Sequence, residues 1–238
     1  MNQETKKDLA FYITTPHACS YLDDKEAVTL FADPEVDINT QQYSKLITYG
    51  FRRSGTHIYR PRCPQCDACI PLRIPVNEFK PSRNQRRVLK ANTDIQLIAR
   101  QAEFSQEHFD LYQLYISTRH AGGGMDDPAP DKYREFLISP WIETTFYEFR
   151  LAETLIAVAV IDQLADGLSA VYTFFQPDFS SRSLGTFAIL KEIEEAQKQG
   201  LPYLYLGFWI RDCENMRYKS NFRPYESLIG SQWVKLQT

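Results

Sequence analysis

The 238-residue sequence has no run of about 18 apolar residues, the minimum for a membrane-spanning helix. Its first residues, MNQETKKDLAFY, have neither the apolar core nor the small-residue cleavage site of a secretory signal. Cysteine is scarce: there are five, an odd number, and three lie close together, which suits reduced thiols or a metal better than a disulfide framework. We therefore expect a cytoplasmic protein without a membrane partner. The sequence leaves the oligomeric state open.

Three familiar catalytic motifs are also missing. There is no Gly-x-Ser-x-Gly nucleophile turn, no Walker phosphate loop and no zinc-hydrolase helix motif. The composition, 43% apolar and 24% charged, is otherwise that of an ordinary globular protein. Any site must therefore be sought in less familiar groupings of side chains.

Basic residues are concentrated in one segment of an acidic chain. Residues 45–100 contain 12 Lys and Arg against 3 Asp and Glu, whereas the remainder contains 15 against 27. Such asymmetry within a chain points to a polyanionic partner more directly than the overall net charge of −3 does. The segment is predicted to form a surface for phosphates or carboxylates.

The order of predicted elements divides the chain into two regions, 1–95 and 96–238. The first is proline-rich, with short strands and loops. In the second, three β-rich runs precede a helix and a buried strand, over residues 143–153, 154–164, 168–177, 181–200 and 203–210. Antiparallel strands followed by a helix and a strand form the core of N-acetyltransferase (GNAT) folds. We predict an α+β protein with a C-terminal GNAT-like acyltransferase domain and a smaller cysteine-containing N-terminal domain.

An arginine–aromatic group lies in the basic segment, where five residues fall within eleven positions: Arg52, Arg53, Tyr59, Arg60 and Arg62. The guanidinium group binds carboxylates and phosphates through two parallel hydrogen bonds. The pattern favours an anion-binding role, and a solvated surface patch is the alternative.

A basic stripe follows on a short predicted helix with Ser82 as its N-cap. Its members Arg83, Arg86, Arg87 and Lys90 have helical spacing that places at least two or three on one face. Such a stripe can follow nucleic-acid phosphates with salt-dependent affinity. A merely solvated helix face is the alternative.

The start of the predicted helix near residue 184 is a candidate phosphate site. Gly185 would let backbone N–H groups approach an anion there, and the helix dipole favours negative charge. Arg182 lies beside it. Glycine near a helix start is common, so the pattern alone is weak evidence.

Seven blocks of the sequence carry a resemblance to a known family: HACSYL, GFRRSGTHIYRP, CPQCDACIPLRIPV, FKPSRNQRRVLKAN, RSLGTFAIL, GLPYLYLGFWI and MRYKSNFRPYE. From about Phe11 to Leu228, the chain resembles the aminoacyl-tRNA–protein transferases. It looks most like their bacterial branch, the aspartate/glutamate leucyltransferases of the N-degron pathway. The combination of GFRRSG-x-x-x-YRP with the cysteine cluster is the most specific part of this likeness.

The resemblance implies an activity. Enzymes of this family move an amino acid from its charged tRNA to the α-amine of a protein that begins with Asp or Glu, and the new residue marks that protein for degradation by the N-end rule pathway. The implied partners here are leucyl-tRNA and proteins with N-terminal Asp or Glu. The alternatives are arginyl transfer by the same chemistry, a coenzyme-A-dependent N-acyltransferase, and a small zinc protein that only binds RNA.

The cysteines could hold a metal. Cys63, Cys66 and Cys69 are spaced so that three thiolates can converge on one ion, with Cys19 as the fourth ligand or His17 in its place. Free thiols without metal are the alternative. Eukaryotic relatives carry differently spaced cysteines reported to bind a metal or an iron–sulfur cluster. A structural zinc, a cluster and no metal therefore all stay open, and the chemistry itself requires no cofactor.

The absent catalytic motifs agree with the implied chemistry, because the ester of an aminoacyl-tRNA is already activated. An α-amine of pKa about 8 is free base far more often at neutral pH than a lysine of pKa about 10.4. The protein then supplies orientation and charge stabilisation. On this hypothesis Arg52, Arg53, Tyr59 and Arg60 bind the acceptor's acidic side chain. The basic stripe, Arg182 and Gly185 bind tRNA, backbone amides around Gly207 stabilise the oxyanion, and Tyr218 or Lys219 relays the proton.

Overall fold

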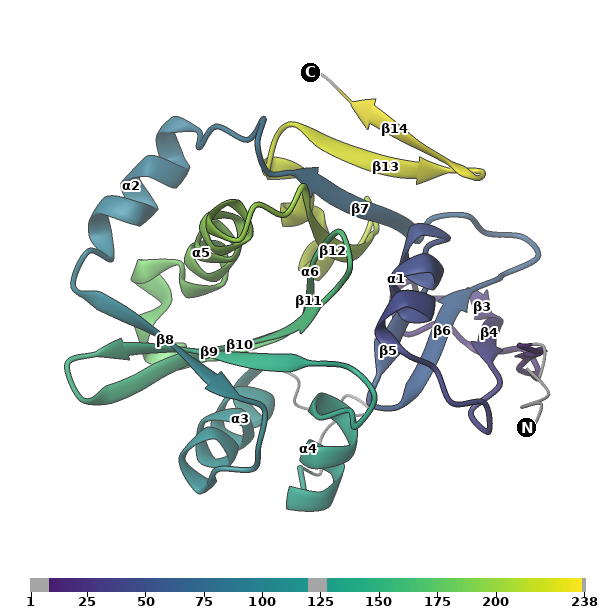
Figure 1. Ribbon diagram of the computed structural model, residues 1–238, viewed down its shortest axis with the longest axis horizontal. Coiled ribbons are helices and arrows are strands. Elements are labelled where there is room, and N and C mark those ends of the chain that lie inside the picture. Colours follow the sequence, from purple (N-terminus) through teal and green to yellow (C-terminus); the bar gives the residue numbers. More distant parts are fainter. Residues whose placement is uncertain (1–8, 120–127, 237–238) are drawn as a thin grey trace, which may run out of the picture.

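A computed structural model describes residues 9–119 and 128–236, and it shows a mixed α/β protein built around a large sheet (Figure 1). The strands of this sheet follow the order β14 (Gln232–Leu236), β13 (Tyr225–Ile229), β7 (Ile70–Pro75), β12 (Tyr203–Trp209), β11 (Gly167–Phe175), β10 (Thr154–Gln163), β9 (Thr144–Leu151) and β8 (Ile95–Gln101). Neighbouring strands are antiparallel except β11 and β12, which are parallel.

A small sheet lies beside the large one at the N-terminal side of the molecule (Figure 1). Its strands follow the order β1 (Phe11–Ile13), β4 (Thr29–Ala32), β6 (His57–Pro61) and β5 (Arg52–Ser54). The helix α1 (Thr40–Thr48) packs here through Tyr43 and Ile47, and the strands β2 (His17–Ala18) and β3 (Glu26–Ala27) form a separate pair.

Helices cover both faces of the large sheet. The helices α2 (Arg83–Ala91) and α5 (Leu184–Lys198) lie on one side, whereas α3 (Gln106–Arg119) and α4 (Pro130–Leu137) lie on the other (Figure 1). Short helical turns connect the rest: η1 (Pro177–Arg182), α6 (Glu214–Arg217) and η2 (Tyr218–Asn221). None of the helices in the described part of the chain combines the length and apolar character that a bilayer crossing requires.

The predicted elements of the second region are confirmed. The strands β9 and β10 fall within the first two β-rich runs, β11 begins one residue before the third, and the turn over residues 164–166 joins β10 and β11 as an antiparallel pair. Ser105, as an N-cap, also predicts a helix through about His120; α3 begins at Gln106, and His120 lies outside the described residues. Local hydrophobic pattern and turn residues were sufficient for these assignments.

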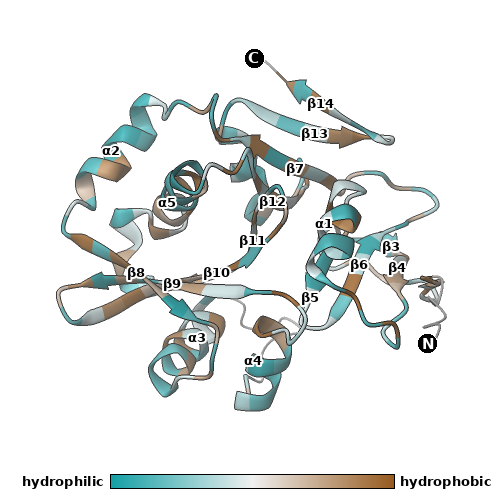
Figure 2. Ribbon diagram, viewed as in Figure 1, coloured by the Kyte–Doolittle hydropathy of each residue, from teal (hydrophilic) through white to brown (hydrophobic). Residues whose placement is uncertain are grey.

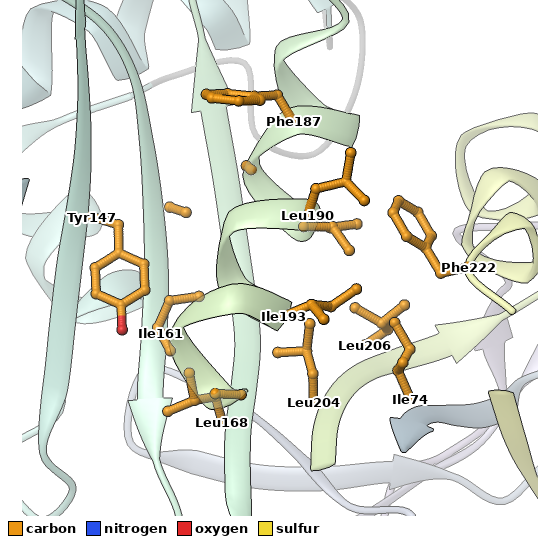
Figure 3. Packing of buried hydrophobic residues seen from close by; sticks show 14 of the residues in the cluster. Ile74, Tyr147, Ile161, Leu168, Phe187, Leu190, Ile193, Leu204, Leu206 and Phe222 are labelled. Atoms are coloured by element: carbon orange, nitrogen blue, oxygen red, sulfur yellow. The ribbon is translucent and has the colours of Figure 1, made fainter. Parts of the chain in front are cut away.

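The main core lies between α5 and the large sheet. In Figure 3, Leu190 and Ile193 of α5 face Leu204 and Leu206 of β12, with Phe222 closing one end of the cluster. A second core on the opposite face joins α3 and α4 to β10 and β11. Because both faces of the central strands are buried, much of these strands is brown or white in Figure 2, while the exposed helix α2 is mostly teal.

The two predicted regions share the large sheet. The strand β7 comes from the first region, yet it lies between β12 and β13 of the second. The core of the small sheet likewise includes Leu164 and Tyr205 from the second region. Residues 1–95 and 96–238 therefore pack together closely, and this arrangement brings the small sheet against the centre of the large one.

The parallel strands β11 and β12 separate soon after they meet. They pair only where Gly167–Ser169 lies beside Tyr203–Tyr205. Beyond this point β12 continues along β7, with a bulge between Tyr205 and Gly207, while β11 continues along β10. We call the space between the two diverging strands the strand split.

Candidate active site

The side chain of Arg52 enters the strand split from the small sheet. Its Nη2 atom donates to the Ala170 carbonyl of β11 at 2.6 Å. On the other side, a Cβ atom added to Gly207 of β12 would lie 2.0 Å from Nη1. Within the described ranges, Nη1 itself is buried without a hydrogen-bond partner. Since a buried unpaired donor is costly, this atom is available to an anionic or carbonyl oxygen of a ligand.

Glu192 of α5 is a buried carboxylate in the same neighbourhood. Its residue is 0% exposed, and neither carboxylate oxygen has a hydrogen-bond partner in the described part of the chain. Burial raises the pKa of Glu192 from its ordinary value to about 8, and the nearby Arg52 guanidinium lowers it in part. A buried carboxyl group with such a pKa is typical of functional sites.

Lys219 and Tyr218 border the site from the turn that follows β12. The ammonium group of Lys219 lies inside the protein, where Nζ donates to the Phe208 carbonyl at 2.9 Å. Burial lowers the pKa of Lys219 to about 7, and the Arg52 guanidinium lowers it further. Tyr218 is 39% exposed, but its hydroxyl lies in buried surroundings, and burial together with the Glu192 carboxylate raises its pKa.

Arg52 therefore interacts electrostatically with titratable groups on several elements. Its charge also lowers the pKa of Tyr43 on α1 and of Tyr59 on β6, against the larger raising effect of burial. The site combines an arginine with one free buried donor, an unpaired buried carboxyl group and an amine that titrates near neutral pH. These groups can bind a carboxylate, bind a cation and accept a proton.

Gly207 is essential to this geometry. Its φ is +73°, and a side chain there would collide with the Arg52 guanidinium. We expect Gly207→Ala to displace Arg52 and to lower the transfer activity that the resemblance implies at least tenfold, with a loss of about 1–2 kcal/mol in folding free energy from the backbone alone. Gly200→Ala is the matched control, because Gly200 has a φ of +68° with no neighbour within 4 Å among the described residues. Equal activities of the two variants in a transfer assay would contradict this arrangement.

The prediction that Arg53 binds substrate needs correction. Its side chain and that of Asp162 are 0% exposed, and they form a bidentate ion pair with both N–O distances at 2.6 Å. The remaining donors reach Thr144 and the carbonyls of Gly55 and Leu137. Because all three guanidinium nitrogens donate inside the protein and the side chain is fully buried, Arg53 joins the small sheet to β10 and is not exposed to a ligand.

Strand alternation separates the remaining members of the arginine–aromatic group. Arg52 pairs with Tyr59 across the small sheet, and the Tyr59 ring lies 6.2 Å from that of Phe208, on the side of the strand split. Arg60 belongs to the opposite face, where its guanidinium lies 5.0 Å from the Phe51 ring centre and donates to the Tyr49 carbonyl. One ligand carboxylate cannot touch Arg52 and Arg60 together.

Arg60 borders an apolar hollow of about 460 Å³ between α1 and the small sheet. Its lining is mainly apolar, with polar groups at the rim: Leu9, Phe11, Leu30, Gln42, Lys45, Leu46, Tyr49, Phe51 and Arg60. The hollow is distinct from the strand split, because its lining residues lie on α1 and on the face of the small sheet that carries Arg60. It is a second place where an apolar side chain could bind.

The basic stripe forms as predicted. Ser82 caps α2, and the capping box with Gln85 is complete. Every member of the stripe is exposed. Within the described residues, none of the four forms an ion pair with an acidic side chain. The helix therefore presents unneutralised positive charge to solvent.

Arg182 serves mainly to position α2 next to α5. Its guanidinium binds Asp94 through two hydrogen bonds of 2.7 and 2.9 Å, and this partner raises the pKa of Arg182. Gly185 lies in the first turn of α5, and a Cβ there would meet only ordinary packing distances. The start of α5 thus lies beside the end of the basic stripe, with its first backbone N–H groups free of any side-chain cap.

The cysteines gather in one region near the site. Burial raises the pKa of the Cys69 thiol to about 12, and Cys19, Cys63, Cys66 and Cys213 all raise it further. In residues 9–119 and 128–236, however, no three His, Cys, Asp or Glu side chains are placed to hold one metal ion. The thiols are neighbours without the convergence that a tetrahedral site needs.

Sequence reasoning missed Glu192. On α5, Glu192 continues the buried row of Leu184, Ala188 and Ala196. The signal was present, because residues four apart lie on one face of a helix. A charged residue in the middle of an apolar row is the pattern that identifies it.

Comparisons with known proteins cover nearly the whole chain. Residues 17–87 match the family described as Arginine-tRNA-protein transferase, N terminus, and residues 107–229 match Arginine-tRNA-protein transferase, C terminus. A protein of Hahella chejuensis (strain KCTC 2396) named aspartate/glutamate leucyltransferase is 51% identical over 230 residues, covering 97% of this chain and 98% of the relative. A protein of Pseudomonas putida (strain W619) with the same name is 53% identical over 228 residues, covering 96% and 97%.

Likeness to solved structures is looser. The structure of L-PGS from Bacillus licheniformis superposes with a TM-score of 0.49 and 10% sequence identity, over 86% of this chain and 70% of that one.

Proposed function

The chain belongs to the Arginine-tRNA-protein transferase family, and from this membership we propose that it is an aspartate/glutamate leucyltransferase. It transfers leucine from leucyl-tRNA to the α-amine of proteins that begin with Asp or Glu, and so creates an N-end rule degradation signal. The observation that carries this conclusion is the identity above 50% with relatives of that name over almost the full length of both chains. We propose a cytoplasmic location for the protein, because the reaction requires charged tRNA.

The reaction is the aminolysis of an ester. The acceptor's α-nitrogen attacks the leucyl carbonyl carbon, the bond to the ribose oxygen breaks, and the proton lost by the nitrogen ends on the ribose hydroxyl. We assign the proton transfer to Lys219, because an amine of pKa about 7 is an effective base at neutral pH. Tyr218 borders the same space, and we assign stabilisation of the developing oxyanion to backbone amides around Gly207, which lies against Arg52.

The acceptor and the donor are held by different groups. The free Nη1 of Arg52, with Tyr59 beside it, is suited to the Asp or Glu side chain of the acceptor. The start of α5 at Gly185 is suited to the terminal phosphate of the tRNA. The basic stripe continues from there and is suited to the acceptor stem. Arg60 is left at the hollow, where it is free to contact a later residue of the acceptor.

We propose a GNAT-like fold for the C-terminal region. Three antiparallel strands, a helix and a parallel strand occur in that order, and the parallel strands diverge after a short paired stretch. An acyl donor lying in such a split would place its carbonyl near Arg52 and Gly207. The strand split is therefore the proposed place of transfer.

The transfer itself needs no cofactor, since the ester supplies the driving force. A structural zinc or iron–sulfur cluster on Cys19, Cys63, Cys66 and Cys69 stays a prediction. If it forms, the thiols must move closer than they lie here. Metal analysis of the purified protein tests it directly.

Charge reversal on the basic stripe should weaken tRNA binding. We expect the double variant Arg86→Glu, Arg87→Glu to bind leucyl-tRNA more weakly, because both side chains are exposed and unneutralised. The slope of log K against log salt should flatten by roughly 1–2, the contribution of about two phosphate contacts. The matched control is Lys198→Glu on α5, whose side chain already pairs with Glu195. A slope unchanged from wild type would show that α2 is only a solvated helix.

A donor competition assay tests the proposed function. The purified protein is incubated with an Asp-starting peptide and with leucyl-tRNA, arginyl-tRNA or acetyl coenzyme A, and the product is identified by mass spectrometry. We expect leucine on the α-amine from leucyl-tRNA only, and no product from a peptide whose α-amine is acetylated. Product from arginyl-tRNA alone would support the arginyl alternative, and product from the thioester alone would overturn the proposal.

A further inference from the structure

We propose that the carboxylate of Glu192 binds the α-ammonium group of the leucyl residue on the donor tRNA. This inference rests on the proposed function and assigns a determinant of donor specificity within the same site. An aminoacyl ester differs from other acyl esters by this ammonium group. An anionic group beside the reacting carbonyl would therefore distinguish aminoacyl donors from other acyl esters.

The first argument is that Glu192 lacks a partner. It is fully buried, and both of its oxygens lie without a hydrogen bond in the described part of the chain. The titratable groups near it are Arg52 of β5, Tyr218 of η2 and Tyr147 of β9, and none of the three satisfies its oxygens. A buried carboxylate is costly unless a cation pairs with it. Both carboxylate oxygens of Glu192 can therefore accept hydrogen bonds from a cation that a ligand supplies.

The second argument is position. Glu192 lies on the row of α5 that begins at Leu184, so it follows the proposed phosphate site at Gly185 by about 10 Å along the helix axis. That length is comparable to the ribose and ester that separate the terminal phosphate of a charged tRNA from the leucyl nitrogen. Arg52 lies close enough to influence the pKa of Glu192 and is itself in the strand split. The carboxylate is thus on the donor's path to the reacting centre.

The third argument decides between the two amines of the reaction. The acceptor's α-amine must lose its proton before it attacks, and an ion pair with Glu192 would hold that proton in place. Lys219 is the group whose pKa suits proton removal. The donor's α-amine takes no part in bond making, so it can stay protonated and paired. The raised pKa of Glu192 favours its neutral form, and an arriving ammonium group favours ionisation.

The test compares two donors of nearly equal shape. One is leucyl-tRNA, and the other carries the 2-hydroxy analogue of leucine, in which a hydroxyl replaces the ammonium group. Single-turnover transfer to an Asp-starting peptide is measured for wild type, for Glu192→Gln and for the control Glu194→Gln, whose native side chain pairs with Lys191 near the surface. Thermal unfolding of each variant accompanies the rates.

We expect wild type to prefer leucyl-tRNA by about a hundredfold, in the range found for paired buried charges. Glu192→Gln should lose this preference to within about threefold, chiefly by slower transfer of leucine, whereas Glu194→Gln should keep it. A Glu192→Gln enzyme with the wild-type preference, or with equal losses for both donors, would overturn the assignment.

Wild type and a second variant keep the test decisive whatever the stability of Glu192→Gln. Equal rates for the two donors in wild type overturn the assignment without any variant. Glu192→Asp keeps the negative charge on a side chain that is one methylene group shorter. It should therefore slow leucyl transfer more than hydroxyacyl transfer. If wild type transfers leucine normally and only the donor preference differs from expectation, the proposed function stands. If it accepts neither donor, the proposed function fails and this assignment fails with it.

Discussion

Replacing Arg52 by alanine is expected to lower kcat/KM for an Asp-starting peptide by two to three orders of magnitude while leucyl-tRNA binding changes little. Truncating one partner of a buried charged hydrogen bond costs about 2–5 kcal/mol, which corresponds to this range. Arg52 is the residue that crosses the strand split, holds the Ala170 carbonyl and leaves one donor free. Its loss removes the proposed acceptor contact and also raises the pKa of Lys219, since Arg52 lowers it in the native protein.

Arg62→Ala is the matched control for this prediction, because Arg62 is an exposed arginine of the same basic segment. Steady-state kinetics and a filter-binding assay with leucyl-tRNA measure the two effects separately. We expect Arg62→Ala to stay within about threefold of wild type, as is usual for surface substitutions. If Arg52→Ala instead abolishes tRNA binding and spares the peptide KM, Arg52 serves the donor and the two assignments must be exchanged.

Transfer activity is also expected to rise with pH through an inflection near 7 and then to level off. The sign follows from the proposed role of Lys219: burial lowers its pKa to about 7, and only the deprotonated amine accepts a proton. Lys219→Met should lower kcat by about 10²–10⁴, the usual contribution of a general base. The remaining activity should follow the acceptor's own α-amine, so that the inflection moves toward about 8.

Two further variants sharpen the pH experiment. Lys219→Arg keeps a positive charge but cannot act as a base near neutral pH, so it should resemble Lys219→Met. Lys191→Met, which removes a surface lysine paired with Glu194, should keep the inflection near 7. An unchanged pH profile of kcat in Lys219→Met would show that water or another group removes the proton.

Much of the fold follows from local sequence. The apolar runs predict β9, β10 and β11, and the sequence identifies Ser82 as the N-cap of α2. The placement of β7 in the middle of the large sheet was not visible, because pairing between distant strands leaves no local pattern. A boundary drawn from composition near residue 95 therefore separates segments that share one sheet.

The site was predicted less completely, for two physical reasons. Alternation along β5 and β6 directs Arg52 into the strand split, Arg53 into a buried ion pair and Arg60 to the apolar hollow, although the three are close in sequence. Burial raises the pKa of Glu192 and lowers that of Lys219, and this burial depends on the packing of α5 and of the turn after β12. Residue types indicate an anion-binding group, but tertiary packing decides which of the arginines keeps a donor without a partner.

The most direct measurement of the central claim locates the leucyl group on the protein. A tRNA charged with a photoreactive diazirine analogue of leucine is irradiated in complex with the enzyme, and the labelled residues are mapped by mass spectrometry. We predict labelling of β11 and β12 beyond their paired stretch, within residues 170–175 and 206–219, and of α5 around Glu192. Labelling confined to the apolar hollow between α1 and the small sheet would contradict transfer in the strand split.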